Sequence, residues 1–321
     1  MKLALINLYF GKLPAYFPLW LASCQRNPSV DFFLFTDNTI QLNLPSNVNV
    51  VNMSFEEMIE RINGKFPFEV KVLIPYKLTD FKPAYGYIFE DMLISYDYWG
   101  YCDLDLIFGN IMKFVEPPMR DGKKKIYQKG HLTIYKNIES MRTLFMRSGA
   151  RFSYKSVYSD SECYAFDEYG GLIPITNKQS VEEYYQEDMA DISCRINRLT
   201  ASRQTNYDYQ VFYYENGKVY RAYIENDVVR TQEYIYIHIQ KRKYQFDGAY
   251  DCFFILSNRF VEKQPGIPSA DEIRSLSQFV SEAEDHLQLK RYNRMKMREF
   301  LSSSVKRKWI WLNEKLSEKM F

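Results

Sequence analysis

The sequence has few cysteines, few histidines and no long apolar run. Its five cysteines are scattered and odd in number, with no C-x-x-C pair. This pattern argues against a disulfide framework and favours a reduced, cytoplasmic compartment. No uncharged apolar stretch approaches the roughly 18 residues that a membrane-spanning helix needs. Only Lys2 precedes the apolar residues 3–10 and no A-x-A site follows them, so we interpret them as a buried strand rather than a signal core.

An excess of charge of one sign is also missing. The chain carries 42 Lys and Arg against 40 Asp and Glu, and we therefore expect no nucleic-acid partner. Its 321 residues suffice for one large α/β domain with additions, or for two small domains. Aromatic residues are abundant, at 17%, but they suit both pleated sheets and sugar-facing clefts. The aromatic content therefore does not separate fold from function.

The first hundred residues alternate between strand and helix patterns. We predict strands at residues 2–10, 31–38, 48–53 and 98–110, and helices at residues 14–25, from Ser54 onward and from about residue 86 to 95. Ser54 and Glu57 form a capping box at a helix start. This order predicts an α/β fold with a mostly parallel, doubly wound sheet, in which ligands bind beyond the carboxyl ends of the strands.

The second half of the chain changes character. We predict a strand at residues 125–135, a helix at 138–146, a hairpin at 209–223, a strand at 234–240 and helices from residue 269 onward. The Asn-Gly turn at Asn216 is a strong hairpin signal. An antiparallel hairpin region and a helical extension are therefore expected beyond the parallel sheet.

Asp103 and Asp105 stand two residues apart in an apolar, aromatic run. In a strand both side chains lie on one side, with Cα atoms roughly 6.6 Å apart. Two such carboxylates repel each other unless a cation lies between them. Oxygen ligands suit Mg²⁺ or Mn²⁺, and such an ion can hold a diphosphate. The alternative is a pair of solvated aspartates at a strand end.

Six motifs resemble, in their order, the GT-A class of nucleotide-sugar glycosyltransferases, in particular the uncharacterised branch found in bacterial capsule and exopolysaccharide clusters. The motifs are Phe35-Thr36-Asp37, Asp80-Phe81-Lys82-Pro83, Tyr101-Cys102-Asp103-Leu104-Asp105, Gly130-His131-Leu132, Asp167-Glu168, and His238 with Lys241, Arg242 and Lys243. The resemblance covers roughly residues 1–255, but residues 171–230 match nothing. It implies a GT-A-like, Rossmann-like catalytic domain over 1–268, with a nucleotide-binding half at 1–110 and an acceptor-side half at 111–268, followed by an extension over 269–321.

The resemblance also implies a metal site and a donor site. Asp103, Asp105 and His238 would hold Mn²⁺ or Mg²⁺ on the donor diphosphate. The other donor-binding residues would be Tyr9, Asp37, Lys82, Lys241 and Lys243, together with Asp103 itself. Each of these residues also has an alternative structural role. His238 would be a strand histidine hydrogen-bonded to a neighbour, Tyr9 a core tyrosine, Asp37 a turn aspartate, and the lysines solvated surface residues.

The acceptor and catalytic residues follow from the same resemblance. Gly130 and His131 fall where the class lines the acceptor side, although the glycine suits a bulge equally well. Asp167 and Glu168 are the catalytic candidates. An inverting enzyme needs a carboxylate to take the acceptor hydroxyl's proton, and a retaining one needs a carboxylate or amide under the donor sugar. His238 comes late in the sequence, as the metal-binding histidine does in retaining members of the class, and this slightly favours a retaining enzyme.

Three other classes compete with a glycosyltransferase. A sugar-1-phosphate nucleotidyltransferase would need a glycine-rich basic loop near the N-terminus, and residues 8–12 do not form one. A metal-dependent phosphoesterase would carry more than the three histidines present. A non-catalytic carbohydrate-binding or scaffold protein would keep the aromatic residues but would not need Asp103, Asp105 and His238 together.

Residues 289–321 form a basic, amphipathic pattern. Ten basic residues stand against three acidic ones, a local charge of +7 in a chain whose total is +2. Apolar residues including Trp309 and Leu312 recur at helical spacing, and such a helix suits an anionic membrane surface. Acceptors in the resembling branch are commonly lipid-linked, which predicts a peripheral protein at the inner face of the membrane. The alternative is a helix that packs its apolar stripe on the catalytic domain.

Overall fold

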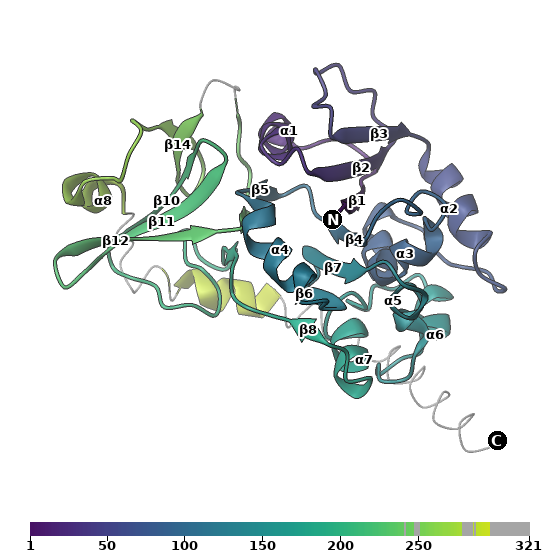
Figure 1. Cartoon of the computed structure of the whole chain (residues 1–321). Helices are drawn as coiled ribbons and strands as arrows, with labels where there is room; N and C mark the ends of the chain where they lie inside the picture. Colours follow the sequence, from purple (N-terminus) through teal and green to yellow (C-terminus); the bar gives the residue numbers. More distant parts are fainter. Residues whose placement is uncertain (241, 247–250, 278–284, 286, 296–321) are drawn as a thin grey trace.

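The computed structural model describes residues 1–240, 242–246, 251–277, 285 and 287–295. These residues form a mixed α/β structure whose largest sheet has seven strands in the order β3-β2-β1-β4-β7-β6-β8 (Figure 1). The strands are β1 (Leu3–Leu8), β2 (Val30–Thr36), β3 (Val48–Asn52), β4 (Tyr98–Cys102), β6 (Lys125–Lys129), β7 (Leu132–Lys136) and β8 (Glu183–Tyr184). The sheet is mostly parallel, since only β7 pairs antiparallel, with β4 and with β6. The predicted α/β fold is confirmed.

The main sheet is buried on both faces. Along β1, Leu3 and Leu5 belong to one core cluster, whereas Ala4 and Ile6 belong to another. A strand covered on both sides must be apolar at nearly every position. This explains why residues 3–8 form a continuous apolar run.

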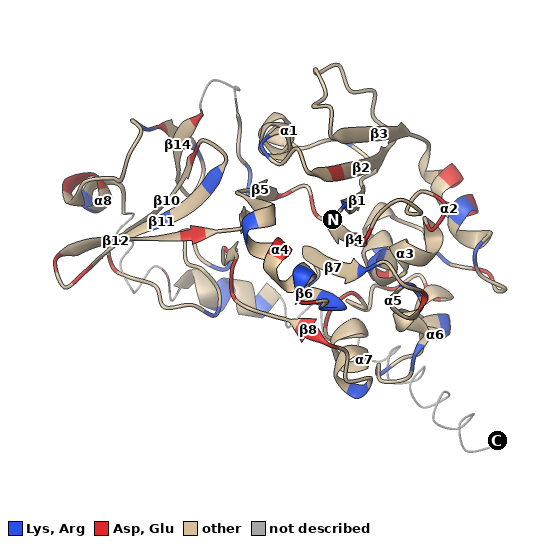
Figure 2. Cartoon of the chain, viewed as in Figure 1, with Lys and Arg blue, Asp and Glu red and all other residues tan. Residues whose placement is uncertain are grey.

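Helices cover the two faces (Figure 1). One face packs against α1 (Phe17–Gln25) and α4 (Ile111–Arg120). The opposite face packs against α2 (Phe55–Asn63), η1 (Pro75–Ala84), α3 (Tyr85–Ile88), α5 (Glu139–Arg142), η2 (Leu144–Met146), α6 (Tyr154–Tyr158) and α7 (Leu172–Lys178). The predicted capping box of Ser54 and Glu57 opens α2. Figure 2 shows basic and acidic residues interspersed over these elements.

A second, antiparallel sheet carries the predicted hairpin. Its order is β12-β11-β10-β14-β15. The bounds are β10 (Gln210–Glu215), β11 (Lys218–Glu225), β12 (Val228–Tyr234), β14 (Cys252–Ile255) and β15 (Phe260–Glu262). Asn216 and Gly217 both have positive φ, 48° and 83°, as a tight hairpin turn of the primed type requires. On one face, α8 (Ala270–Leu276) packs its Ile273 against this sheet.

A third sheet joins three distant segments. It consists of β5 (Leu106–Phe108), β13 (Tyr236–His238) and β9 (Ala190–Asp191), with β13 in the middle. β13 runs antiparallel to β5 and parallel to β9. This small sheet connects the aspartate turn after β4 to the late histidine.

Several predicted elements are shorter or divided. The strand expected at residues 98–110 breaks into β4 and β5, so that Asp103 and Asp105 lie in a turn and not in a strand. The strand expected at 125–135 is the β6–β7 hairpin, because Tyr127 has a positive φ of 65° and the pairing register shifts after Ile126. The strand expected at 234–240 divides between two sheets, because Tyr234 ends β12 of the second sheet and Tyr236 begins β13 of the third. Between them the Ile235 N–H donates to the Asp188 carbonyl. The helix expected from residue 86 to 95 is only the short α3.

The end of the described chain is helical at residues 287–295. There the Asn197 N–H donates to Gln288 Oε1 at 2.8 Å, and Arg195 lies over the Tyr292 ring. Lys241 and most of the basic amphipathic pattern, including Trp309 and Leu312, lie outside the described residues. Within the described part of the chain, no helix combines the length and apolar character that crossing a membrane requires.

Candidate active site

The aspartate turn lies at the carboxyl edge of the main sheet. Asp103 follows β4 directly, and its N–H donates to the His131 carbonyl at 3.1 Å. Asp105 precedes β5, and its carbonyl accepts from the Ile239 N–H at 3.0 Å. Both backbones are therefore fixed by hydrogen bonds to segments far away in sequence. This edge is where ligands bind in parallel-sheet proteins.

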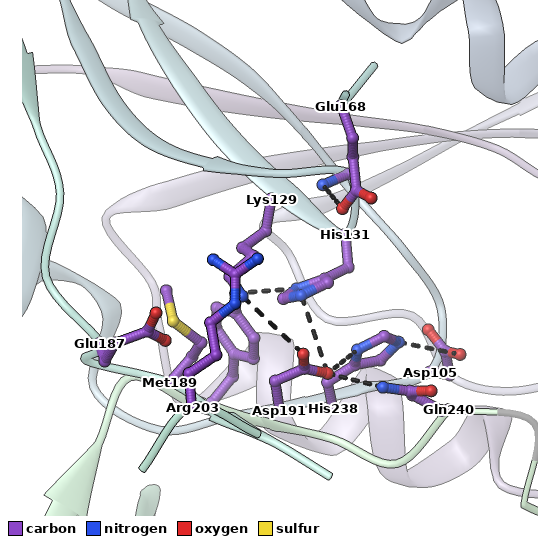
Figure 3. A network of polar contacts seen from close by, with 12 residues as sticks. Asp105, Lys129, His131, Glu168, Glu187, Met189, Asp191, Arg203, His238 and Gln240 are labelled. Carbon is purple, nitrogen blue, oxygen red and sulfur yellow. Dashed lines mark hydrogen bonds and ion pairs between the residues drawn. The ribbon is translucent and has the colours of Figure 1, made fainter. Parts of the chain in front are cut away.

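The small sheet brings His238 and Asp191 to this turn. In its register His238 faces Leu106, the residue after Asp105, and on its other side faces Asp191. His238 Nε2 lies 3.3 Å from Asp105 Oδ2, and Nδ1 lies 2.9 Å from Asp191 Oδ1 (Figure 3). Gln240 Nε2 donates to the same Asp191 oxygen at 2.7 Å. The histidine is thus held between two carboxylates.

His131 completes this group. Its ring lies against the His238 ring, with centroids 4.2 Å apart, and Nδ1 lies 2.9 Å from the Tyr236 hydroxyl. Ligand atoms of His131, Asp191 and His238 all lie within 4.8 Å of one another, so these residues could hold a metal ion. The structure therefore adds Asp191 and His131 to the surroundings of the predicted metal ligands.

Opposite charges compensate each other around His238. Burial alone would lower the pKa of His238, but the carboxylates of Asp105 and Asp191 raise it to about 10. Burial would raise the pKa of Asp105, yet the charge of His238 and a hydrogen bond to it hold that pKa below its usual value. Burial and the neighbouring His238 lower the pKa of His131 well below its ordinary value. A protonated His238 thus supplies the cation that the carboxylates need.

The donor set fits a divalent cation. Asp191 offers a carboxylate oxygen, and His131 and His238 offer ring nitrogens, that of His238 once its proton leaves. Asp105 lies at the other ring nitrogen of His238. Carboxylate and imidazole ligands suit Mn²⁺, and carboxylates suit Mg²⁺. Because a metal competes with the imidazole proton, binding would release that proton.

Lys82 links the aspartate turn to the predicted catalytic pair. Its buried ammonium lies 2.6 Å from Asp103 Oδ1 and 3.7 Å from Asp167 Oδ2, and it donates to the Gly130 carbonyl at 2.8 Å. Burial would lower the pKa of Lys82, but Asp103 and Asp167 raise it above its ordinary value. Burial also raises the pKa of Asp103, although Lys82 opposes this effect. Lys82 therefore stays charged between the two carboxylates.

A buried ion pair positions the predicted catalytic pair. Lys77 and Asp80 lie 2.8 Å apart with fully buried side chains, and Asp80 accepts the N–H groups of Tyr164 and Phe166. These bonds hold the chain just before Asp167. The turn beyond it is tight, since a Cβ on Gly170 would lie 2.0 Å from the Tyr164 carbonyl oxygen.

Asp167 and Glu168 both approach Gly130. Glu168 Oε1 accepts the Gly130 N–H at 2.8 Å, and a Cβ on Gly130 would lie 2.6 Å from Asp167 Oδ2. A side chain at this position would therefore displace these carboxylates. Burial raises the pKa of Asp167 to about 7, although Lys82 lowers it in part. An acid with this pKa can exchange protons near neutral pH.

A pocket of about 380 Å³ opens beside the aspartate turn. Its lining includes the predicted residues Tyr9, Lys82, Asp103 and Asp105, and also Asn7, Tyr16 and Tyr76. Asp37 is not among the lining residues; its carboxylate accepts the Gly11 N–H at 3.0 Å and so shapes the loop after β1. Lys243 is exposed, and the neighbouring Arg242 donates to backbone carbonyls such as that of Ser193.

The sequence did not reveal every residue at this site. Asp191 holds His238, Gln240 donates to the same Asp191 oxygen, and Tyr16 and Tyr76 line the pocket. Asp191 lies in the stretch that matched no motif, and the two-residue strand that carries it leaves no periodic pattern. Only the pairing of β9 with β13 reveals its place.

The structure defines an α/β protein with a cluster of carboxylates and histidines at the carboxyl edge of its main sheet. The chain belongs to a family of unknown function, DUF6625, whose model matches residues 5–264. No curated protein matches the chain. A solved structure of the galactosyltransferase LgtC, in complex with donor and acceptor sugar analogues, has 10% identity and a TM-score of 0.33, over 60% of this chain and 75% of that one. A TM-score this low assigns neither fold nor function.

Replacing Gly130 tests the close approach of the two carboxylates. We expect Gly130→Ala to lower the free energy of unfolding by about 1–3 kcal/mol, because the new methyl group displaces Asp167 and Glu168. Gly64→Ala is the matched control: its φ of −62° suits alanine and its nearest neighbour would lie at 3.5 Å. The control should change stability by less than about 1 kcal/mol. Urea unfolding of both variants measures this, and equal effects would contradict the steric argument.

The raised pKa of Asp167 makes a pH-dependent prediction. The folded protein binds this proton more tightly than the unfolded chain, so the contribution of Asp167 to the free energy of unfolding should fall as the pH rises from about 4 toward 7. Asp167→Asn removes the titration. We therefore expect the variant to gain stability relative to wild type between pH 5 and 7, by up to about 1.4 kcal/mol per pH unit. Urea unfolding in EDTA measures the difference, and a pH-independent offset would refute the assignment.

Proposed function

We propose that the chain is a metal-dependent glycosyltransferase of GT-A-like fold that moves a sugar from a nucleoside-diphosphate donor to a glycan acceptor. One observation carries the proposal. Asp103, Asp105 and Lys82 line one pocket at the carboxyl edge of a mostly parallel sheet, and His238 lies against Asp105. A neutral ligand would not need this combination of carboxylates, imidazole and ammonium.

The pocket suits the donor in size and chemistry. Its volume of about 380 Å³ falls within the range of small-molecule sites, about 300–1,000 Å³. Tyr9, Tyr16 and Tyr76 provide aromatic surface for a base and ribose, while Lys82 provides charge for a phosphate. The remaining donor residues that we propose are Asp37, Lys241 and Lys243.

A divalent cation held by Asp103, Asp105 and His238 would stabilise the negative charge of the departing diphosphate. Lys82 adds a second positive charge, because Asp103 and the Gly130 carbonyl fix its ammonium beside the pocket. His238 would give up its proton when the cation binds and would then offer Nε2 as a ligand. The two positive charges of the cation would replace the one that His238 loses beside the carboxylates.

We propose Asp167 and Glu168 as the catalytic carboxylates, with Gly130 and His131 on the acceptor side. With a pKa of about 7, Asp167 can accept a proton from a sugar hydroxyl at neutral pH. Glu168 is oriented by the Gly130 N–H at 2.8 Å. The late position of His238 slightly favours retention at the anomeric carbon.

The cellular setting that we propose is surface polysaccharide synthesis, with a lipid-linked acceptor at the inner face of the cell membrane. Residues 1–268 would form the catalytic domain, with halves at 1–110 and 111–268, and 269–321 an extension. The charge of +7 at residues 289–321 would hold the protein on anionic lipid, since each basic residue contributes about 1 kcal/mol. We expect salt-sensitive cosedimentation with anionic vesicles that is lost on truncation at Leu289. Salt-insensitive binding, or binding that persists after truncation, would exclude this anchor.

A panel of nucleotide sugars tests the activity. We expect hydrolysis of at least one of them in Mn²⁺, which stops in EDTA and falls at least about 10²-fold in Asp103→Asn and Asp105→Asn. Asp97→Asn, the same change at the exposed opposite end of β4, is the matched control and should keep the activity. Nucleotide-sugar binding without turnover would favour the carbohydrate-binding alternative. Metal-dependent cleavage of the nucleotide sugar by pyrophosphate, which gives a nucleoside triphosphate and a sugar 1-phosphate, would favour the nucleotidyltransferase.

A further inference from the structure

A second, smaller hollow lies beside the β6–β7 turn. It measures about 60 Å³ and is lined by Gln128, Lys129, Glu168, Tyr169, Ile173 and Arg203. The two hollows meet at one residue: the Gly130 carbonyl accepts from Lys82 of the larger pocket, and its N–H donates to Glu168 of the smaller one. The smaller hollow therefore lies next to the proposed reaction centre and is separate from the donor pocket.

Lys129 brings a poorly compensated charge to this hollow. The residue is only 8% exposed. Among the residues that the structure describes, its one ion-pair partner is Asp191 Oδ2 at 3.9 Å, beyond hydrogen-bond distance, and its ammonium donates no hydrogen bond. The side chain is largely buried, and its ammonium reaches solvent at the hollow that it lines. An anionic ligand in the hollow would supply the missing acceptor.

Arg203 is held over the same hollow by its neighbours. The Ser202 N–H donates to the Asp191 carbonyl, and Gln204 Nε2 donates to the Met189 carbonyl, each at 2.7 Å. Between them Arg203 has a positive φ of 60°, which costs energy for a residue with a side chain. Figure 3 shows Arg203 and Lys129 reaching the network from separate chain segments.

The Arg203 guanidinium has no acidic partner within the described ranges of the chain. It donates to the Tyr169 hydroxyl and lies 5.9 Å from that ring's centroid. Glu168, the acidic residue of the hollow, directs one oxygen to the Gly130 N–H. Two cationic groups thus share the hollow with one carboxylate, that of Glu168, one oxygen of which accepts the Gly130 N–H. A guanidinium fork beside an ammonium is a typical arrangement for recognising phosphate or carboxylate.

We propose that this hollow binds an anionic group, a phosphate or a carboxylate, carried by the second substrate. The acceptor would then be an anionic glycan or a phosphate-linked one, anchored by Lys129 and Arg203. The hollow is too small for a sugar ring, so it holds the charged group alone. Its assignment to the acceptor rests on the proposed glycosyltransferase function; the binding of an anion does not.

Calorimetric titration of the full chain tests the site with two probes, inorganic phosphate and glucuronate. EDTA removes divalent cations, and NaCl keeps the ionic strength constant. We expect at least one probe to bind wild type, and Lys129→Gln and Arg203→Gln each to weaken that binding at least tenfold. Arg230→Gln is the matched control: it makes the same charge change on β12, where Arg230 pairs with Glu225 at 2.9 Å. The control should bind like wild type.

Each outcome has a definite meaning. Binding of phosphate alone points to a phosphate-linked acceptor, and binding of glucuronate points to an acidic sugar. If neither probe binds, or if binding survives Arg203→Gln, the site is refuted; Arg203 is exposed, so this variant should fold even if Lys129→Gln does not. If Arg230→Gln weakened probe binding as much as Arg203→Gln does, the effect would come from the overall charge of the protein, and the site would be refuted. Nucleotide-sugar hydrolysis is measured separately, so a missing anion site and a missing transferase activity are distinguishable.

Discussion

The site depends on the pairing of β13 with two short strands. β13 places His238 beside Leu106 on one side and Asp191 on the other, and both neighbouring strands, β5 and β9, are distant from β13 in the sequence. Side chains alternate along a strand, so a slip by one residue would turn His238 to the opposite face. Its two carboxylate contacts and its packing against His131 would then be lost together. The register of β13, a strand of three residues, therefore determines which side chains form the cluster.

Charge compensation is the second constraint, and it explains why this cluster can form. Buried carboxylates are unfavourable unless cations or hydrogen bonds stabilise them. Lys82 lies between Asp103 and Asp167, and His238 lies between Asp105 and Asp191. Each cation thus serves two carboxylates. The lysine is permanently charged, whereas the histidine can exchange its proton for a metal ion. A metal ion could therefore replace that proton at the histidine side.

The sequence predicted the large features and missed the short ones. The parallel sheet and the Asn216 hairpin follow from long apolar runs and from turn chemistry, both of which are local signals. The break of the aspartate strand has no such signal, because β5 is only three residues long and its partner β13 lies more than a hundred residues away. Asp105 and His238, which the resemblance assigned to one site, lie 3.3 Å apart. Asp191 could not be found in this way, since only tertiary pairing brings β9 to the site.

Gly130 shows how the sequence can identify a residue without giving the reason for it. Its pattern suggested either a close approach by a sugar or a strand bulge, and both interpretations concern the space beside the glycine. In the structure Asp167 and Glu168 occupy that space. Gly130 accepts a hydrogen bond from Lys82 through its carbonyl group and donates one to Glu168 through its N–H group. These two groups belong to consecutive peptide units that meet at the Gly130 Cα. The proposed donor and acceptor sides therefore share one structural element.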